Sequence, residues 1–113
     1  PGGMPGTLNL EADKTVQEYI DFANEKGVLV CAICAAPSIL GHKGLLQGKK
    51  AVCFPGFEKD LAGAEISKNG VVRDGNIITA KGMGVSLEFG LEILAVLQGK
   101  EKADAVKAAV QSN

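Results

Sequence analysis

A layered α/β domain is predicted by three features of this sequence. The run from Val28 to Ile33 is apolar without polar alternation, which is typical of a central parallel strand covered on both faces. Segments with helical spacing alternate along the chain with segments rich in strand-forming residues. The chain has 113 residues, of which 46% are hydrophobic, and this is enough for one domain with its own core.

Local signals predict the elements of the first half in order. Residues 1–6 contain two Pro and three Gly, which predicts a loop. Asp13 is a predicted N-cap for a helix that ends at Gly27. The apolar side chains on one face of that helix are Val16, Tyr19, Ile20 and Ala23. After the strand, Pro37 suits the first turn of a short helix over 38–42.

The second half of the sequence contains signals for strands, a hairpin and helices. The expected elements are a strand over 50–54, a short helix over 58–62, a hairpin of 71–72 and 76–80 with a tight turn at Asp74-Gly75, a loop over 82–84, a helix over 88–97 capped by Ser86, and a last helix over 103–110. Their order indicates a single layered domain rather than a repeat array.

Composition excludes several classes of partner. The net charge is -1 and the lysines are scattered, so nucleic acid is not expected. No apolar run is long enough to cross a membrane, and no secretory signal is visible. Three cysteines cannot all pair within the chain, which favours a reducing compartment. We therefore expect a cytoplasmic protein.

Cys34 stands where the predicted strand turns into the predicted helix. Such a junction lies at the carboxyl edge of the sheet, where open α/β sheets bind ligands. The positive end of the helix favours a thiolate there, and the backbone N–H of Ala35 could serve as an oxyanion donor. The arrangement is the cysteine form of a nucleophile elbow. The alternative is a small buried hydrophobe, as free cysteines commonly are.

Cys31 and Cys34 form a C-x-x-C, but a redox pair is not favoured because Cys31 lies inside the predicted strand. Residues three apart on a strand point to opposite faces, so the two thiols should diverge. A zinc site would need His42 and Cys53 to converge, and their spacing is not a recognised ligand pattern. Cys31 and Cys53 are expected in or near the core, and His42 as a polar residue near a helix end.

Four segments, in order, resemble motifs of the ThiJ/PfpI superfamily. Residues 32–37 (Ala-Ile-Cys-Ala-Ala-Pro) resemble its A-I-C-A-G-P elbow, and Pro1-Gly2-Gly3 resembles the P-G-G loop ahead of it. Residues 50–55 resemble the strand after the elbow, and residues 82–89 (Gly-Met-Gly-Val-Ser-Leu-Glu-Phe) resemble G-P-G-T-S-x-E-F. Residues 1–113 are therefore identified as the C-terminal part of a single ThiJ/PfpI-type domain.

The resemblance implies a flavodoxin-like three-layer sandwich with a mostly parallel sheet, in a homodimer that needs no cofactor or metal. It implies a nucleophilic Cys34 with the backbone N–H groups of Gly3 and Ala35 as oxyanion donors. It also implies an upstream glutamate that hydrogen-bonds the cysteine, for which this chain has no matching residue. We expect the N-terminal strands to come from a segment outside this chain, as a separate or cleaved fragment.

The resemblance further implies an enzyme that acts on reactive carbonyls. Cys34 would form a thiohemiacetal with a 2-oxoaldehyde and yield a 2-hydroxy acid, as a glyoxalase does, or would deglycate glycated groups. The alternative is a redox sensor or stress-response chaperone in which Cys34 is oxidised without turnover. A protease or amidase ranks lowest, because those branches place a His where Ala35 stands.

Three positions depart from the motifs. Ala36 stands where the human-like sequence of the family has Gly, and Phe54 where that sequence has His, a position at which bacterial members resemble this chain more closely. Met83 stands where the family has Pro. These differences bear on the substrate more than on the nucleophile.

Overall fold

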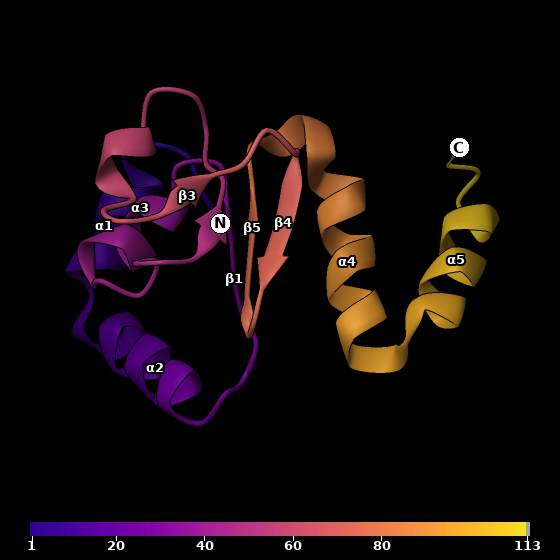
Figure 1. Ribbon diagram of the computed structural model, residues 1–113, viewed down its shortest axis with the longest axis horizontal. Coiled ribbons are helices and arrows are strands. Elements are labelled where there is room, and N and C mark those ends of the chain that lie inside the picture. Colours follow the sequence, from indigo (N-terminus) through magenta and orange to yellow (C-terminus); the bar gives the residue numbers. More distant parts are fainter. Residues whose placement is uncertain (113) are drawn as a thin grey trace.

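The structure is a computed structural model that describes residues 1–112. Figure 1 shows a central sheet with α1, α2 and α3 on one side and α4 and α5 on the other. The helices are α1 (Gly6–Ala12), α2 (Lys14–Glu25), α3 (Pro37–His42), α4 (Ser86–Gln98) and α5 (Lys100–Ala109), with short 3-10 helices η1 (Glu58–Asp60) and η2 (Met83–Val85). The strands are β1 (Val30–Ile33), β2 (Lys50–Ala51), β3 (Glu65–Ile66), β4 (Val71–Asp74) and β5 (Ile77–Ala80).

The main sheet has the order β1-β5-β4, and β2 and β3 form a separate parallel pair. β1 runs parallel to β5, and β4 runs antiparallel to it. All four residues of β5 are buried, so β5 is the most completely covered strand. Within residues 1–112, β1 pairs with β5 on one side only, so the central place of the 28–33 strand in a full domain stays a prediction.

The core lies between β1, β5 and α3. Its side chains include Val30 and Ala32 of β1, Ile39 and Leu40 of α3, and Ile77 of β5. Each large apolar side chain buried in this way contributes about 1.5–3 kcal/mol. α3 has only six residues, too few to be stable alone, and five of them are buried. Packing therefore holds α3 and the turn before it in place.

Several predicted boundaries are confirmed and others shift. Asp13 caps α2, since its Oδ1 accepts a hydrogen bond of 3.0 Å from the N–H of Val16. The hairpin turn lies at 75–76, one residue later than predicted, because Asp74 still pairs with Ile77. Ser86 is the first residue of α4 rather than its N-cap, and its hydroxyl donates to the carbonyl of Met83.

Two elements were not predicted, and one is shorter than predicted. α1 and β3 carry no strong local signal: β3 has two residues, and α1 has no side-chain cap. β2 ends at Ala51, well short of residue 54. After it, the N–H of Val52 donates to the Thr79 hydroxyl at 3.0 Å, and the N–H of Phe54 donates to the carbonyl of Cys34 at 2.7 Å. After Ala51 the chain therefore leaves the β2–β3 pair, and its N–H groups bond to β5 and to the residue that follows β1.

α4 is apolar, yet none of its residues is buried. It packs against β4, β5 and α5. Among residues 1–112, none of the helices combines the length and the apolar character needed to cross a bilayer.

Candidate active site

Cys34 lies between the end of β1 and the start of α3 and has a φ of 68°. A residue with a Cβ pays about 1–2 kcal/mol to adopt this left-handed conformation. Two hydrogen bonds hold it there: the N–H of Cys34 donates to Ala80 at 2.8 Å, and its carbonyl accepts from Phe54 at 2.7 Å. Such strain, held by surrounding structure, is typical of functional sites.

The loop of residues 1–3 passes directly over Cys34. A Cβ built on Gly2 would lie 2.6 Å from the Cβ of Cys34, 2.7 Å from the carbonyl oxygen of Ile33 and 3.0 Å from the nitrogen of Ala35. Only a glycine permits this approach. The loop therefore lies against the elbow through Gly2, and Gly3, the next residue, has a φ of 85°.

The N–H groups of Gly3 and Ala35 are available as donors. Within residues 1–112, neither one donates to a backbone or side-chain acceptor. The turn that carries Ala35 is fixed from below, because the buried Ser38 hydroxyl donates to the Ala35 carbonyl at 2.7 Å. The elbow therefore places the Cys34 thiol next to the backbone N–H of Ala35, which could bind an oxyanion.

The other two cysteines differ from Cys34 in surroundings. Cys53 is buried, and burial raises its pKa to about 11, with smaller contributions from Glu58 and Asp60. Cys31 is half-buried, and burial raises its pKa as well. All three cysteines are free. Cys31 and Cys53 therefore lie in or near the core, as predicted, and both favour the unreactive thiol form.

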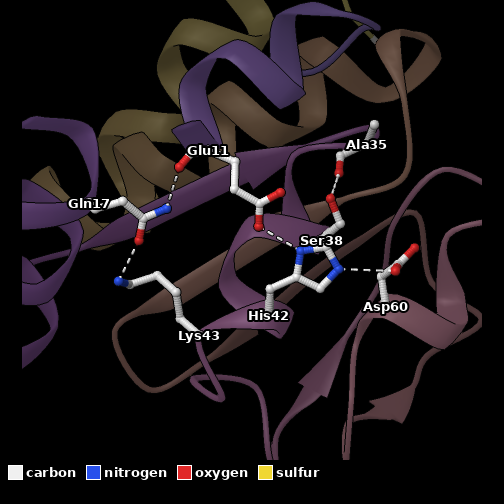
Figure 2. Close-up of polar contacts among 7 residues, drawn as sticks. All are labelled: Glu11, Gln17, Ala35, Ser38, His42, Lys43 and Asp60. Atoms are coloured by element: carbon white, nitrogen blue, oxygen red, sulfur yellow. Dashed lines mark hydrogen bonds and ion pairs between the residues drawn. The ribbon is translucent and has the colours of Figure 1, made fainter. Parts of the chain in front are cut away.

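His42 lies in the last turn of α3 and binds carboxylates. Its Nδ1 lies 2.5 Å from Glu11 Oε2, and its Nε2 lies 3.0 Å from Asp60 Oδ1. Figure 2 shows the imidazole between the two carboxylates. The sequence predicted the polar position but not these partners, which are 31 and 18 residues away. In the described part of the chain, no three His, Cys, Asp or Glu residues are placed to hold a metal ion.

An apolar hollow of about 330 Å³ lies at the same edge of the sheet. Its lining residues are Phe54, Pro55, Lys81, Gly82, Met83 and Gly84. The N–H of Phe54 also donates to the Cys34 carbonyl, so one lining residue of the hollow contacts the elbow directly. Two of the three departures noted in the sequence, Phe54 and Met83, therefore line this hollow.

Comparison with known proteins identifies the family. The model of the DJ-1/PfpI family matches residues 1–96. Protein DJ-1 homolog A of Arabidopsis thaliana is 40% identical over 111 residues, which cover 96% of this chain and 28% of the relative. Protein dj-1beta of Drosophila melanogaster is 35% identical, covering 94% of this chain and 58% of the relative. An isonitrile hydratase of Pseudomonas putida is 33% identical, covering 95% and 47%.

Solved structures confirm the flavodoxin-like fold. Oxidized DJ-1 of Toxoplasma gondii superposes with a TM-score of 0.93 at 33% identity, covering 99% of this chain and 61% of that one. DJ-1beta of Drosophila melanogaster superposes with a TM-score of 0.90 at 34% identity, covering 100% and 62%. The chain thus spans about three fifths of these structures. It belongs to the DJ-1/PfpI family, and this membership supports a function built on a reactive cysteine.

Proposed function

We propose that this chain carries the nucleophile of a cofactor-free enzyme that acts on reactive carbonyls. The observation that carries the proposal is the strained Cys34, at a φ of 68°, lying under the backbone of Gly2 and beside the free N–H of Ala35. A thiol in this position can attack an electrophilic carbon while adjacent N–H groups bind the resulting oxyanion. Cys34 is the nucleophile, and Gly3 and Ala35 are the oxyanion donors.

The reaction on a 2-oxoaldehyde needs no external oxidant. The Cys34 thiolate attacks the aldehyde carbon; a C–S bond forms, and the carbonyl π electrons move to oxygen as a thiohemiacetal oxyanion. A base removes the proton from that carbon and a proton is added to the neighbouring keto carbon, so one carbon is oxidised while the other is reduced. Water then cleaves the thioester, releasing a 2-hydroxy acid and the free thiol. Attack on an early glycation adduct begins with the same C–S bond.

The base belongs to a part of the domain outside this chain. The family resemblance places it on an upstream glutamate, and we propose that a preceding segment supplies both this residue and further strands. The free side of β1 is where such a strand would pair. A cavity of about 180 Å³ beside β1, lined by apolar residues of α1, α2 and α3, supports additional packing there. We further propose that the complete domain forms a homodimer and works in the reducing cytoplasm.

The test compares the full-length protein with its Cys34→Ala and Cys34→Ser variants. Consumption of methylglyoxal and appearance of lactate are measured, with Cys31→Ala as a matched control at a half-buried cysteine. The proposal requires that both Cys34 variants lose all turnover and that the control keeps it. Lactate formation that survives Cys34→Ser overturns it.

A second candidate is a cysteine-oxidation sensor without turnover. It is favoured by the similarity to a DJ-1 whose oxidized form has been solved, together with the half-buried Cys34 at the turn between β1 and α3. A thiolate in such a place is oxidised first to sulfenic and then to sulfinic acid. Mass spectrometry after mild peroxide separates the two: oxygen addition confined to Cys34, without any methylglyoxal turnover, selects the sensor.

A further inference from the structure

His42 links three segments that are far apart in sequence. Its two ring nitrogens face Glu11 at the end of α1 and Asp60 in η1, while His42 itself closes α3 (Figure 2). A neutral imidazole has one N–H and can donate to only one of these carboxylates. An imidazolium donates to both. The full link therefore exists only when His42 is protonated.

The surroundings favour that protonated form. Hydrogen bonds that the imidazolium donates to Asp60 and then to Glu11 raise the pKa of His42 above its ordinary value of 6.5, and burial opposes them only in part. The neighbouring Lys43 is engaged elsewhere, with Asp21 at 2.8 Å and Gln17 at 2.6 Å, both on α2. In η1, the other carboxylate, Glu58, accepts from the N–H of Gly56 at 2.8 Å.

Each linked segment leads to Cys34 at its other end. α1 follows the loop of residues 1–3, and the N–H of Thr7 donates to the Gly3 carbonyl at 2.9 Å. α3 follows the elbow directly. η1 follows the turn at Phe54, whose N–H donates to the Cys34 carbonyl. The three segments that meet at Cys34 are thus joined again by the His42 imidazole, at their ends away from Cys34.

The contact with α1 is the one that depends most on His42. α3 and η1 are in direct backbone contact, since a Cβ on Gly41 would lie 2.0 Å from the carbonyl oxygen of Asp60. α1 buries a single side chain, Thr7, and its hydroxyl has no partner among residues 1–112. The bond between His42 and Glu11 is therefore the direct side-chain contact between the end of α1 and α3. A second, indirect link runs through Gln17 of α2, whose Nε2 donates to the Glu11 carbonyl at 2.8 Å and whose Oε1 accepts from Lys43 at 2.6 Å. Unlike that link, the His42 contact depends on a group that can lose its charge near neutral pH.

We propose that His42 is a positioning residue: as an imidazolium it holds α1 against α3 and so keeps the Gly2–Gly3 loop over Cys34. The inference rests on the proposed carbonyl chemistry for its kinetic effect, but its structural effect can be measured without turnover. When His42 loses its proton, Glu11 or Asp60 is released, and the Gly3 oxyanion donor is less well placed. The Cys34 thiol keeps its position, because the backbone hydrogen bonds of Cys34 to Ala80 and Phe54 do not involve His42.

The kinetic test uses the full-length protein and the His42→Asn variant. We expect kcat for methylglyoxal to fall by roughly tenfold, below the ~100-fold cost of a 1 Å misplacement, with KM little changed. Alkylation of Cys34 by iodoacetamide needs no oxyanion donor, so its rate should change by less than about twofold. A parallel loss of kcat and alkylation rate would mean that His42 supports the whole elbow, which overturns the proposal.

The pH profile distinguishes positioning from simple packing. In the wild type, kcat divided by the alkylation rate should fall as the pH rises through the raised pKa of His42. His42→Arg keeps a permanent cation with several donors and should remove this fall while retaining activity. Glu11→Gln should reproduce the effect of His42→Asn. The matched control is Lys100→Gln, which breaks an exposed Lys100–Asp104 pair of 2.7 Å on α5 and should leave kcat unchanged.

Hydrogen–deuterium exchange decides the structural claim even if the protein turns over no carbonyl. At one pH, residues 3–12 should exchange faster in His42→Asn than in the wild type, while 30–33 of β1 stay protected. Unchanged exchange in residues 3–12 overturns the positioning role. Faster exchange there without any methylglyoxal turnover in the wild type retains the positioning role and rejects only the proposed substrate chemistry.

Discussion

The backbone of Gly2 lies against the Cβ of Cys34 at the centre of the candidate site. A Cβ at position 2 would stand 2.6 Å from the Cβ of Cys34, a separation that real Cβ atoms essentially never show. Two of the three nearest atoms to that Cβ are backbone atoms, of Ile33 and Ala35, so they cannot rotate away. The distance between loop and elbow is therefore set by the absence of a side chain at Gly2.

Replacing Gly2 by Ala should push the loop away from Cys34. We expect kcat/KM for methylglyoxal to fall by about 100-fold, because the Gly3 donor moves by roughly 1 Å. Steady-state kinetics on the full-length protein measure this. Gly6→Ala is the matched control, since a Cβ there meets nothing within 4 Å. Equal activity of the two variants would show that the loop does not take part in the reaction.

Cys34→Gly and Cys34→Ala should differ in stability though both lack the thiol. At a φ of 68°, alanine keeps the left-handed strain and glycine does not. We therefore expect the glycine variant to have a free energy of unfolding about 1 kcal/mol higher than the alanine variant. Urea denaturation of both proteins gives the difference. An alanine variant as stable as the glycine variant would mean that the elbow relaxes once the sulfur is gone.

Gly41→Ala should destabilise the domain, because its Cβ would lie 2.0 Å from the Asp60 carbonyl oxygen. Overpacking against backbone costs about 1–3 kcal/mol in the free energy of unfolding. Gly90→Ala, in α4, is the matched control: its Cβ meets nothing within 4 Å, so it should stabilise the helix by about 0.5–1 kcal/mol. Thermal unfolding of the two variants checks both signs. A stable Gly41→Ala protein would show that α3 and η1 can separate without cost.

Cys53 should resist alkylation at neutral pH. Burial raises its pKa to about 11 and raises the pKa of Cys31 as well, so both are thiols at neutral pH. Iodoacetamide followed by peptide mass spectrometry should label Cys34 first in the native protein and all three cysteines in urea. The Cys53 rate should rise as the pH approaches 11. Early labelling of Cys53 would mean that the core opens readily.

Local patterns in the sequence were sufficient for the elements that depend on neighbouring residues. Asp13 at its N-cap, Pro37 in the first turn of α3 and the hairpin at Gly75 were all predicted within about one residue. The elbow position of Cys34 was predicted as well, because an apolar strand, small residues and a proline follow one another directly. In each case the determining interaction spans only a few residues.

The tertiary structure decided the features that join distant segments. The sequence does not show that β5 takes the central place, that α1 forms, or that His42 lies between Glu11 and Asp60. Nor does it determine the 2.6 Å approach at Gly2, which depends on how the loop packs over the elbow. The sequence by itself determined the turn between β1 and α3 and the place of Cys34 in it, since short-range backbone preferences encode them. The donors and anchors around it exist only once packing brings together residues that no local pattern connects.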